Sequence, residues 1–266
     1  MFKSRILPGA AITVVTFGCI LLCRATRVVF FAALALASVY ELTKILKNVD
    51  VEFQYAVPAC YVVGQLALVL VRADIIWMLT WFGLMAFACL FRVILRPALG
   101  AKNAVWTLFG MLWPFFFYGV VMALAGTEKA SIILTLGILS TWGCDSAALF
   151  AGRALGRHKL APTVSPHKTW EGAIGGALFS IAAGALLHLI LRGFGGPGLV
   201  CCMATALIAS SFGQAGDLAA SLIKRMCGVK DYSRLIGEHG GIMDKMDSML
   251  FSLPVCWVCL YAFGWL

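Results

Sequence analysis

Long apolar runs joined by short connections are the feature that most constrains how this chain can fold. They can be read at about residues 6–23, 28–46, 54–71, 75–95, 104–125, 130–150, 171–191, 198–222 and 247–266. A helix needs about 20 mostly apolar residues to cross the hydrocarbon layer of a bilayer. The runs are continuous rather than alternating, which favours helices. We therefore predict an all-α, polytopic integral membrane protein with about nine transmembrane helices and short loops.

The composition excludes a water-soluble fold. Of the 266 residues, 62% are hydrophobic and only 12% are charged, whereas about a quarter of the residues in a soluble domain are charged. The ten cysteines lie mostly within apolar runs, so we interpret them as packing residues and infer neither a disulfide nor a zinc site. Lys3 and Arg5 precede the first run, as in a signal peptide. No small-residue cleavage site follows, so we interpret the run as a retained helix.

Positive charge predicts the orientation of the chain. Two thirds of the 21 Lys and Arg residues lie in connections that follow even-numbered runs. The positive-inside rule places these connections in the cytoplasm and both termini on the opposite side. The two longest polar connections, at about 152–171 and 224–247, fall on this basic side. We therefore expect the cell membrane (inner or plasma), with the active site facing the cytoplasm. The net charge of +9 is spread over several loops, which argues against a nucleic-acid partner.

The acidic residues separate the chain into two parts. Seven of the 12 acidic residues lie from residue 145 onward. We predict that residues 1–128 form a scaffold of about five spans and that residues 129–266 carry the chemistry, within one structural unit overall. Asp145 lies inside the sixth run and Asp217 inside the eighth. An ionisable side chain at membrane depth costs a few kcal/mol, so both are functional-site candidates.

Helical spacing brings several polar residues together. Asp217, Ser221 and Lys224 are separated by steps of four and three, so they share one helix face, and Arg225 extends it. This face begins inside the membrane and leads to the basic surface. At the start of the chain, only the four residues 24–27 separate the first two runs, which predicts a tight helical hairpin there.

Carboxylates that converge beside cations are typical of magnesium-dependent phosphoryl or nucleotidyl transfer. Asp244 and Asp247 are three residues apart and share a face at the start of the last run. Mg²⁺ takes oxygen ligands, usually one or two carboxylates plus substrate phosphates. We predict that Asp217, Asp244 and Asp247 hold Mg²⁺, with Asp145 as a further candidate and room for a second cation. Three late acids are equally well explained by pairing with neighbouring bases: Glu171, Asp231 and Glu238.

One connection carries paired glycines. Gly240 and Gly241 follow His239, and paired glycines let backbone N–H groups approach an anion closely. Alone, this pattern is also that of an ordinary turn.

The other long connection ends in a pattern suited to a helix start. Ser165 and Pro166 are typical of a turn, and Thr169 is suited to an N-cap. Lys168 would then lie just outside the helix, where the helix dipole and the cation together favour a phosphate.

Read in order, these residues resemble the phosphatidate cytidylyltransferase (CDP-diacylglycerol synthase) family. The family motif contains Ser-x-x-Lys-Arg, then Lys-Asp, His-Gly-Gly and Asp-Arg-x-Asp. The matching residues here are Ser221, Lys224, Arg225, Lys230, Asp231, His239, Gly240, Gly241, Asp244, Lys245 and Asp247. The Gly-Gln-x-Gly-Asp segment at 213–217 and the Ser-Pro-x-Lys-Thr-x-Glu-Gly block at 165–172 also match. Lys245 replaces the usual arginine, and Gly237-Glu238 replaces the usual Pro-Gly.

The resemblance implies a reaction and a set of roles. CMP would pass from CTP to phosphatidic acid, giving CDP-diacylglycerol and pyrophosphate for phospholipid biosynthesis, with Mg²⁺ required. The expected catalytic residues are Asp217, Lys224, Arg225, Asp244 and Asp247. The expected substrate-binding residues are Ser165, Lys168, Thr169, Ser221, Lys230, Asp231, His239, Gly240 and Gly241. The partners would be CTP, phosphatidic acid and membrane lipids, and a homodimer is left open.

Two other functions remain open from the sequence. A CTP-dependent polyprenol kinase would transfer a phosphoryl group to an alcohol instead of CMP to a phosphate. An anion transporter would also use buried acids and glycines near the membrane midplane, but the sequence contains no inverted repeat.

Overall fold

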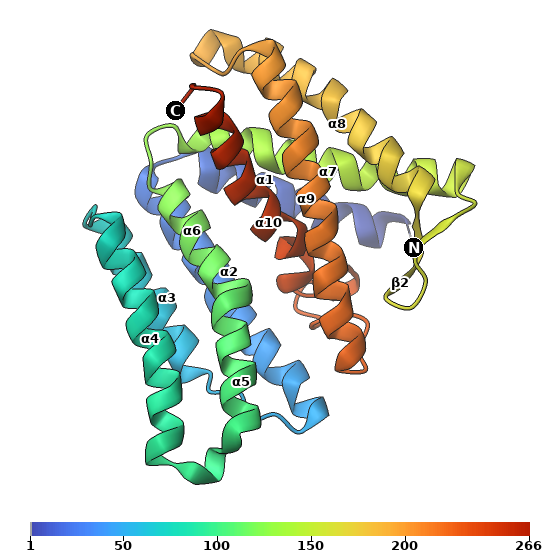
Figure 1. The fold of residues 1–266 in the computed structure, drawn as a ribbon. Helices are drawn as coiled ribbons and strands as arrows, with labels where there is room; N and C mark the ends of the chain where they lie inside the picture. Colours follow the sequence, from blue (N-terminus) through green and yellow to red (C-terminus); the bar gives the residue numbers. More distant parts are fainter. Residues whose placement is uncertain (1) are drawn as a thin grey trace. The chain divides into compact units, whose positions relative to one another are not determined.

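The computed structural model describes residues 2–266, except for the side chains of residues 2–10 and of His239. In chain order, its elements are α1 (Phe2–Leu21), α2 (Arg24–Leu46), η1 (Lys47–Val49), α3 (Ala56–Leu70), α4 (Ile75–Leu95), η2 (Pro97–Leu99), α5 (Gly100–Gly110), η3 (Met111–Phe115), α6 (Phe116–Ala125), α7 (Ala130–Leu155), β1 (Lys159–Ala161), β2 (Ser165–Thr169), α8 (Trp170–Leu191), η4 (Arg192–Phe194), α9 (Leu199–Met226), η5 (Gly237–His239) and α10 (Met243–Ala262) (Figure 1).

The predicted all-α membrane architecture is confirmed. Each predicted run forms helix, and the run at 75–95 has the same bounds as α4. Six helical segments are long and apolar enough to cross a membrane: Arg24–Val49, Ile75–Leu95, Pro97–Ala125, Ala130–Leu155, Trp170–Phe194 and Leu199–Met226. Ala11–Leu21 and Ala56–Leu70 are apolar but shorter, and α10 carries charged residues in its first turns. The chain is a multi-pass membrane protein, and the number of nine spans stays a prediction.

The chain divides into two compact units. Unit 1 consists of Met1–Glu128 and Met226–Asp244, and unit 2 of Lys129–Arg225 and Lys245–Leu266. The polar connection that follows α9 therefore belongs to unit 1, whereas the one that precedes α8 belongs to unit 2.

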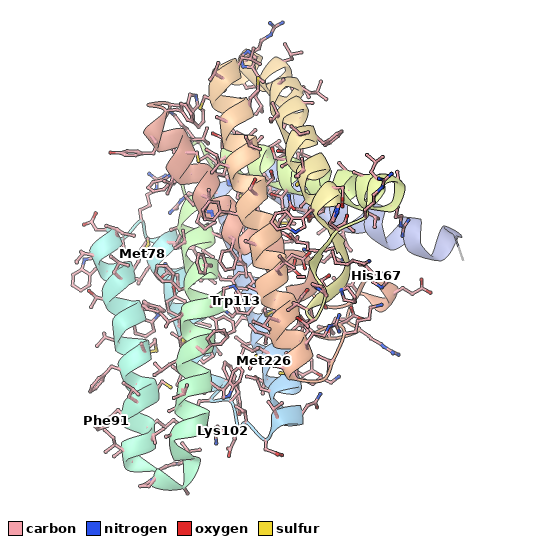
Figure 2. The ribbon with its side chains drawn as sticks, turned by 45° about the vertical axis from the view of Figure 1, so that its right-hand side comes forward. Met78, Phe91, Lys102, Trp113, His167 and Met226 are labelled. Atoms are coloured by element: carbon pink, nitrogen blue, oxygen red, sulfur yellow. The ribbon has the colours of Figure 1, made fainter. Side chains whose placement is uncertain are left out.

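Unit 1 is organised around α2. This helix packs against α3 and α6, and α3 packs in turn against α4 (Figure 1). A 2.7 Å hydrogen bond between the hydroxyls of Ser38 and Tyr118 joins α2 to α6 inside the unit. By contrast, α4 buries only Cys89, and aromatic side chains such as Phe91 project outward from it (Figure 2). A helix so apolar and so uncovered is suited to contact lipid tails.

Unit 2 packs its helices closely through small residues. α7 lies along α8, and α8 buries Gly172, Gly176, Ser180 and Gly184 at four-residue spacing. A Cβ on Gly176 would lie 2.7 Å from the carbonyl oxygen of Cys144 in α7. Small residues at this spacing let helix backbones approach each other in membranes. The apolar core of unit 2 draws on α7, α8, α9 and α10: Ile133, Leu136, Leu187, Leu191, Cys202, Ala209, Cys256 and Leu260.

Two local features differ from the predictions. The expected linker at 24–27 is the first turn of α2, so the connection from α1 consists of residues 22 and 23 alone. The connection before α8 contains an antiparallel hairpin, in which Lys159 pairs with Thr169 and Ala161 with Ser165. Strands of three and five residues are too short to give a periodic sequence signal, and for this reason the hairpin was not predicted.

Candidate active site

Charged and hydroxyl side chains of unit 2 gather where β2, α7, α9 and α10 approach one another. We call them the lysine–aspartate cluster, which consists of Asp145, Lys168, Asp217, Ser221, Lys224, Asp247 and Ser248. Its shortest contact joins Lys168 Nζ to Asp217 Oδ2 at 2.6 Å. Ser221 Oγ donates a 3.3 Å hydrogen bond to Asp217 Oδ1 from the next turn of α9. The predicted shared face of Asp217 and Ser221 is thus confirmed.

The second pair of the cluster is more deeply buried. Lys224 and Asp247 are each only 6–7% exposed, and Lys224 Nζ lies 3.9 Å from Asp247 Oδ2. The backbone N–H of Ser248 donates to Asp247 Oδ1 at 2.8 Å. A buried charge costs several kcal/mol unless it is paired and hydrogen-bonded. The lysine and the backbone N–H together meet this requirement for Asp247.

Asp145 brings a third carboxylate to the cluster from α7. Ser248 Oγ lies 3.5 Å from its Oδ2. The side chain is within electrostatic range of Asp217, Lys168 and Lys245. Asp145 and Asp217 therefore share one partly buried region with Lys168 and Lys245, where the reduced dielectric strengthens every charge interaction.

Glycines of α9 let the cluster form. A Cβ on Gly216 would lie 2.7 Å from the carbonyl oxygen of Asp247, so any larger residue would push α10 away. Gly213 likewise faces the Ser248 carbonyl. Gln214, between these glycines, donates to the carbonyl of Ala173 in α8 at 3.2 Å. The segment at 213–217 thus fixes α9 against its neighbours and delivers Asp217 to its partner.

The start of α8 positions Lys168. Thr169 is the N-cap, as predicted, and its hydroxyl accepts a 3.1 Å hydrogen bond from the Gly172 N–H. Lys168 is the residue immediately before the cap. The prediction that Ser165 and Pro166 begin a turn is wrong, because both lie in β2 and the turn precedes them. Because β2 pairs with β1 and leads directly into α8, Lys168 lies in a fixed strand next to the start of the helix.

Unit 1 contains a hydrogen-bonded polar loop just before α10. Asp244 Oδ2 accepts backbone hydrogen bonds from Tyr232 at 2.8 Å and from Gly241 at 2.9 Å. Gly240 has φ of +81°, a left-handed conformation that favours glycine. Asp244 therefore ties both ends of the glycine-containing loop to the start of α10.

Glu41 of α2 holds the same loop and was not identified from the sequence. It is fully buried. Its Oε1 accepts from Ser233 Oγ at 2.6 Å and from the Ile242 N–H at 2.8 Å, and its Oε2 accepts from the Met243 N–H at 2.8 Å. A Cβ on Gly241 would lie 2.5 Å from Oε1. The second glycine of the motif thus leaves room for a carboxylate supplied by the predicted scaffold.

The other predicted residues lie around these two regions. Arg225 Nε donates to the Val164 carbonyl at 3.2 Å and so contacts the hairpin before α8. Ser165 is half-buried in β2, and Lys230 and Asp231 are exposed in the loop of unit 1. The side chain of His239 lies outside the described part of the chain. Glu171 is one of the three acids that pairing with a neighbouring base could explain, and it does pair with His158 Nδ1 at 2.6 Å.

The donor atoms of the cluster are compatible with Mg²⁺. Its uncharged and anionic donors are the carboxylate and hydroxyl oxygens that Mg²⁺ prefers. Among the described residues, no three His, Cys, Asp or Glu side chains form a ready-made metal cage. Mg²⁺ does not require one, since it commonly binds one or two carboxylates plus substrate phosphates and water. The donor set therefore fits this ion.

Comparison with known proteins identifies the class. The sequence matches the cytidylyltransferase family over residues 3–263, so the chain belongs to that family. The phosphatidate cytidylyltransferase of Brucella suis biovar 1 (strain 1330) is 34% identical over 239 residues, which cover 88% of this chain and 83% of that protein. The phosphatidate cytidylyltransferase of Pseudomonas aeruginosa is 35% identical over 147 residues, 55% of this chain and 54% of that protein. The resemblance found in the sequence is confirmed.

A third relative matches over a shorter region. The phosphatidate cytidylyltransferase of Staphylococcus saprophyticus is 41% identical over 122 residues, which cover 46% of each chain.

Proposed function

We propose that this membrane enzyme transfers CMP from CTP to phosphatidic acid, giving CDP-diacylglycerol and pyrophosphate. The near-full-length similarity to proteins named phosphatidate cytidylyltransferase supports the choice of substrates. The observation that carries the reaction class is the pairing of Lys168 with Asp217 and of Lys224 with Asp247 within one unit. Cations suited to phosphates and carboxylates suited to Mg²⁺ are thereby held side by side.

The reaction needs little covalent help from the protein. A phosphate oxygen of phosphatidic acid bonds to the α-phosphorus of CTP, and the bond from that phosphorus to the bridging oxygen breaks as pyrophosphate leaves. The nucleophile is already an anion, so positioning and charge stabilisation can supply most of the catalysis. We assign Lys168, Lys224 and Arg225 to the phosphates. Each lysine would then exchange its aspartate partner for a phosphate oxygen when substrate binds.

The carboxylates released by that exchange would hold the metal. We assign Asp217 and Asp247 to this role, with Asp145 beside them. Bound Mg²⁺ would neutralise charge that develops on the transferred phosphate. Asp244 belongs to unit 1, where its Oδ2 accepts two backbone hydrogen bonds, and its predicted role as a ligand stays a prediction.

A two-substrate assay tests this function. Purified protein in detergent would receive CTP labelled in both the cytosine and the α-phosphate, phosphatidic acid, and either Mg²⁺ or EDTA. We expect cytidine and α-phosphate to enter the lipid fraction together, with one pyrophosphate released per product and no product in EDTA. Release of CDP with an unlabelled lipid product would instead identify a kinase. Substrate flux in proteoliposomes without nucleotide would identify a transporter.

The proposed function also needs a defined orientation of the chain in the membrane. We expect the loops that carry the site to face the cytoplasm at the cell membrane, because the longest polar connections are the basic ones. A cysteine placed at the exposed Lys230, with exposed Cys23 and Cys60 replaced by serine, tests this. It should react with a membrane-impermeant maleimide in inverted vesicles but not in intact cells. Labelling in intact cells would mean that the orientation is the opposite one.

The oligomeric state is a separate question. The mass of the detergent-solubilised particle tests whether the chain is a homodimer.

A further inference from the structure

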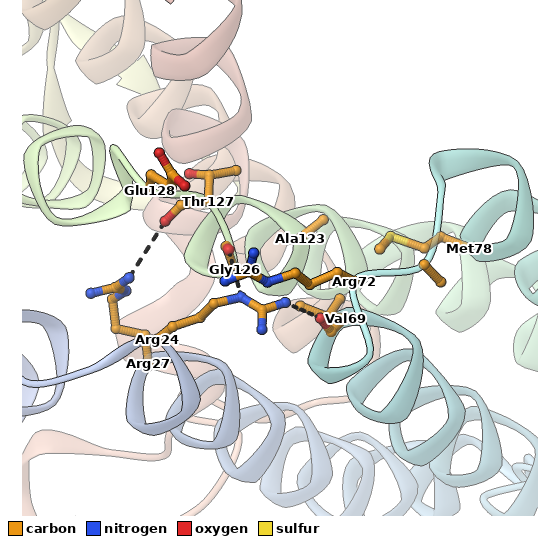
Figure 3. Close-up of a pocket in the computed structure, with 10 residues that line it drawn as sticks. Arg24, Arg27, Val69, Arg72, Met78, Ala123, Gly126, Thr127 and Glu128 are labelled. Carbon is orange, nitrogen blue, oxygen red and sulfur yellow. Dashed lines mark hydrogen bonds between the residues drawn. The ribbon is translucent and has the colours of Figure 1, made fainter.

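A pocket of about 550 Å³ in unit 1 is lined by three arginines and is not used by the proposed reaction (Figure 3). Arg24 and Arg27 come from the first turn of α2, and Arg72 comes from the residues just after α3. Val69 and Met78 add apolar surface to the same pocket. We call it the arginine pocket. Its volume is typical of sites for small molecules and cofactors, which occupy about 300–1,000 Å³.

Two of the guanidinium groups are held in place by helix ends. Arg24 donates to the carbonyls of Gly126 at 2.8 Å and of Val69 (Figure 3), and also to the carbonyl of Leu70 at 3.2 Å. Arg27 Nε donates to the Ala125 carbonyl at 3.0 Å. These carbonyls end α3 and α6, where the helix dipole is negative. The arginines are therefore pre-organised, and part of the entropy cost of ordering them for a ligand is already met by the fold.

The positive charge of the pocket is only partly balanced. Carbonyls are neutral, and Glu128 is the one carboxylate among the described residues that line the pocket, against three guanidinium groups. Arg24 uses three of its five N–H donors. Arg72 is exposed, and although its backbone N–H donates to the Val69 carbonyl at 3.1 Å, its guanidinium group has no hydrogen bond or ion pair to any described residue. The arginines of the pocket therefore keep both unused N–H donors and positive charge with which to bind an anion.

The location of the pocket favours a lipid as the source of that anion. It lies at the ends of three candidate spans, since Arg24 and Ile75 begin two of them and Ala125 ends the third. Such positions correspond to the headgroup region of a bilayer. An apolar wall, including Val69 and Met78, stands beside the cations. A lipid presents the same combination, a phosphate next to a glycerol and acyl chains.

We propose that the arginine pocket binds the phosphate group of a membrane lipid, with Arg72 as the mobile contact and Arg24 and Arg27 as the fixed ones. Guanidinium groups bind phosphate through paired charge-assisted hydrogen bonds. The lipid would be a resident ligand and not a reactant, because the pocket contains none of the residues assigned to CMP transfer. This site is independent of the identity of the reaction.

Arg72→Gln is the variant that tests the site, because its side chain supports no described contact of the fold. Arg192→Gln is the matched control, an exposed arginine in another connection with no described side-chain partner. The probes are dioctanoyl phosphatidylglycerol, dioctanoylglycerol without phosphate, and inorganic phosphate, each titrated into purified protein in neutral detergent. Phosphatidylglycerol is not a substrate of the proposed reaction, so its binding reports on a separate site. The dissociation constant is read from native mass spectrometry and the ligand-induced rise in Tm.

We expect phosphatidylglycerol to bind the wild type, and to bind Arg72→Gln about tenfold more weakly because one charge-assisted contact is lost. Arg192→Gln should bind as the wild type does, and turnover of CTP and phosphatidic acid, measured without added phosphatidylglycerol, should be unchanged in Arg72→Gln. Equal affinity of the wild type and Arg72→Gln would overturn the assignment. An equal rise in Tm with dioctanoylglycerol would also overturn it, because the site would then be apolar. An equal rise with inorganic phosphate alone would overturn it too, because the ligand would then be a soluble anion.

Discussion

The carboxylates of unit 2 and those of unit 1 have different partners. In the lysine–aspartate cluster, Asp217 and Asp247 face lysine ammonium groups. In unit 1, Glu41 of α2 and Asp244 of α10 face backbone N–H groups of the loop before α10. A lysine side chain can turn to another anion, whereas a backbone N–H can leave only if the loop itself moves. The cluster is thus built to exchange partners, and the loop is built to keep one shape.

Asp217→Asn should have the largest effect on turnover and show most clearly that the lysine–aspartate cluster acts in catalysis. The amide keeps the size of the side chain but loses the charge that would bind Mg²⁺, so turnover should fall by about 100-fold or more. Because Asp217 is only half-buried and lies beside Lys168, Tm should shift by no more than about 2 °C. Asp74→Asn, an exposed aspartate at the start of α4, is the matched control. Near wild-type turnover in Asp217→Asn would remove this residue from the site.

Lys168 offers a test of partner exchange. Lys168→Gln should lower kcat/KM by about 10- to 100-fold, since one charge-assisted contact to phosphate is lost. Lys168→Arg should recover part of the loss because it keeps the charge but changes the geometry. If the lysine only neutralised Asp217, Lys168→Gln would alter Tm and leave KM for both substrates unchanged. Initial rates over a matrix of CTP and phosphatidic acid concentrations distinguish these outcomes.

Glu41→Gln should affect the loop instead of the charges of the cluster. The amide nitrogen cannot accept, so at least one of the three donors loses its partner, at a cost of about 2 kcal/mol or more. Tm should fall by about 5 °C, and turnover per folded molecule by about tenfold if the loop positions substrate. Glu52→Gln, an exposed glutamate of the same unit, is the control. A lowered Tm with unchanged turnover would make Glu41 purely structural.

Of these four substitutions, Ser233→Ala should have the smallest effect. It removes the hydroxyl that donates to Glu41 and accepts from the Leu235 N–H, but both backbone donors to Glu41 remain. We expect a loss of about 1 kcal/mol of stability and less than about a threefold change in turnover. A larger drop in turnover than in Glu41→Gln would show that Ser233 acts on substrate directly.

The helices could be predicted from the sequence because lipid imposes a simple rule on every span. The apolar run at 75–95 needed only length and hydropathy to match α4. The shared face of Asp217 and Ser221 on α9 followed from helical periodicity. The motif residues followed from resemblance to a family, which gave their order but not their partners.

The partners of Glu41 could not be predicted because they are distant in the chain. Glu41 lies 192 residues from Ser233 and 202 from Met243, and no periodic pattern links residues so far apart. Within α2 it reads as a lone acid in an apolar run. That isolation is itself a signal at membrane depth, and applying the rule to residues 1–128 would have identified it.

The small-residue face of α8 restricts how this chain can vary in length. Gly172, Gly176 and Gly184 contact neighbouring backbones on one side only. Deleting a single residue before Gly176 would turn the rest of the helix by about 100° and present larger side chains to α7 and α9. Point substitutions on the opposite, exposed side, such as at Leu178, should be tolerated. Within α8, insertions and deletions should therefore be far rarer among functional variants than changes of residue type.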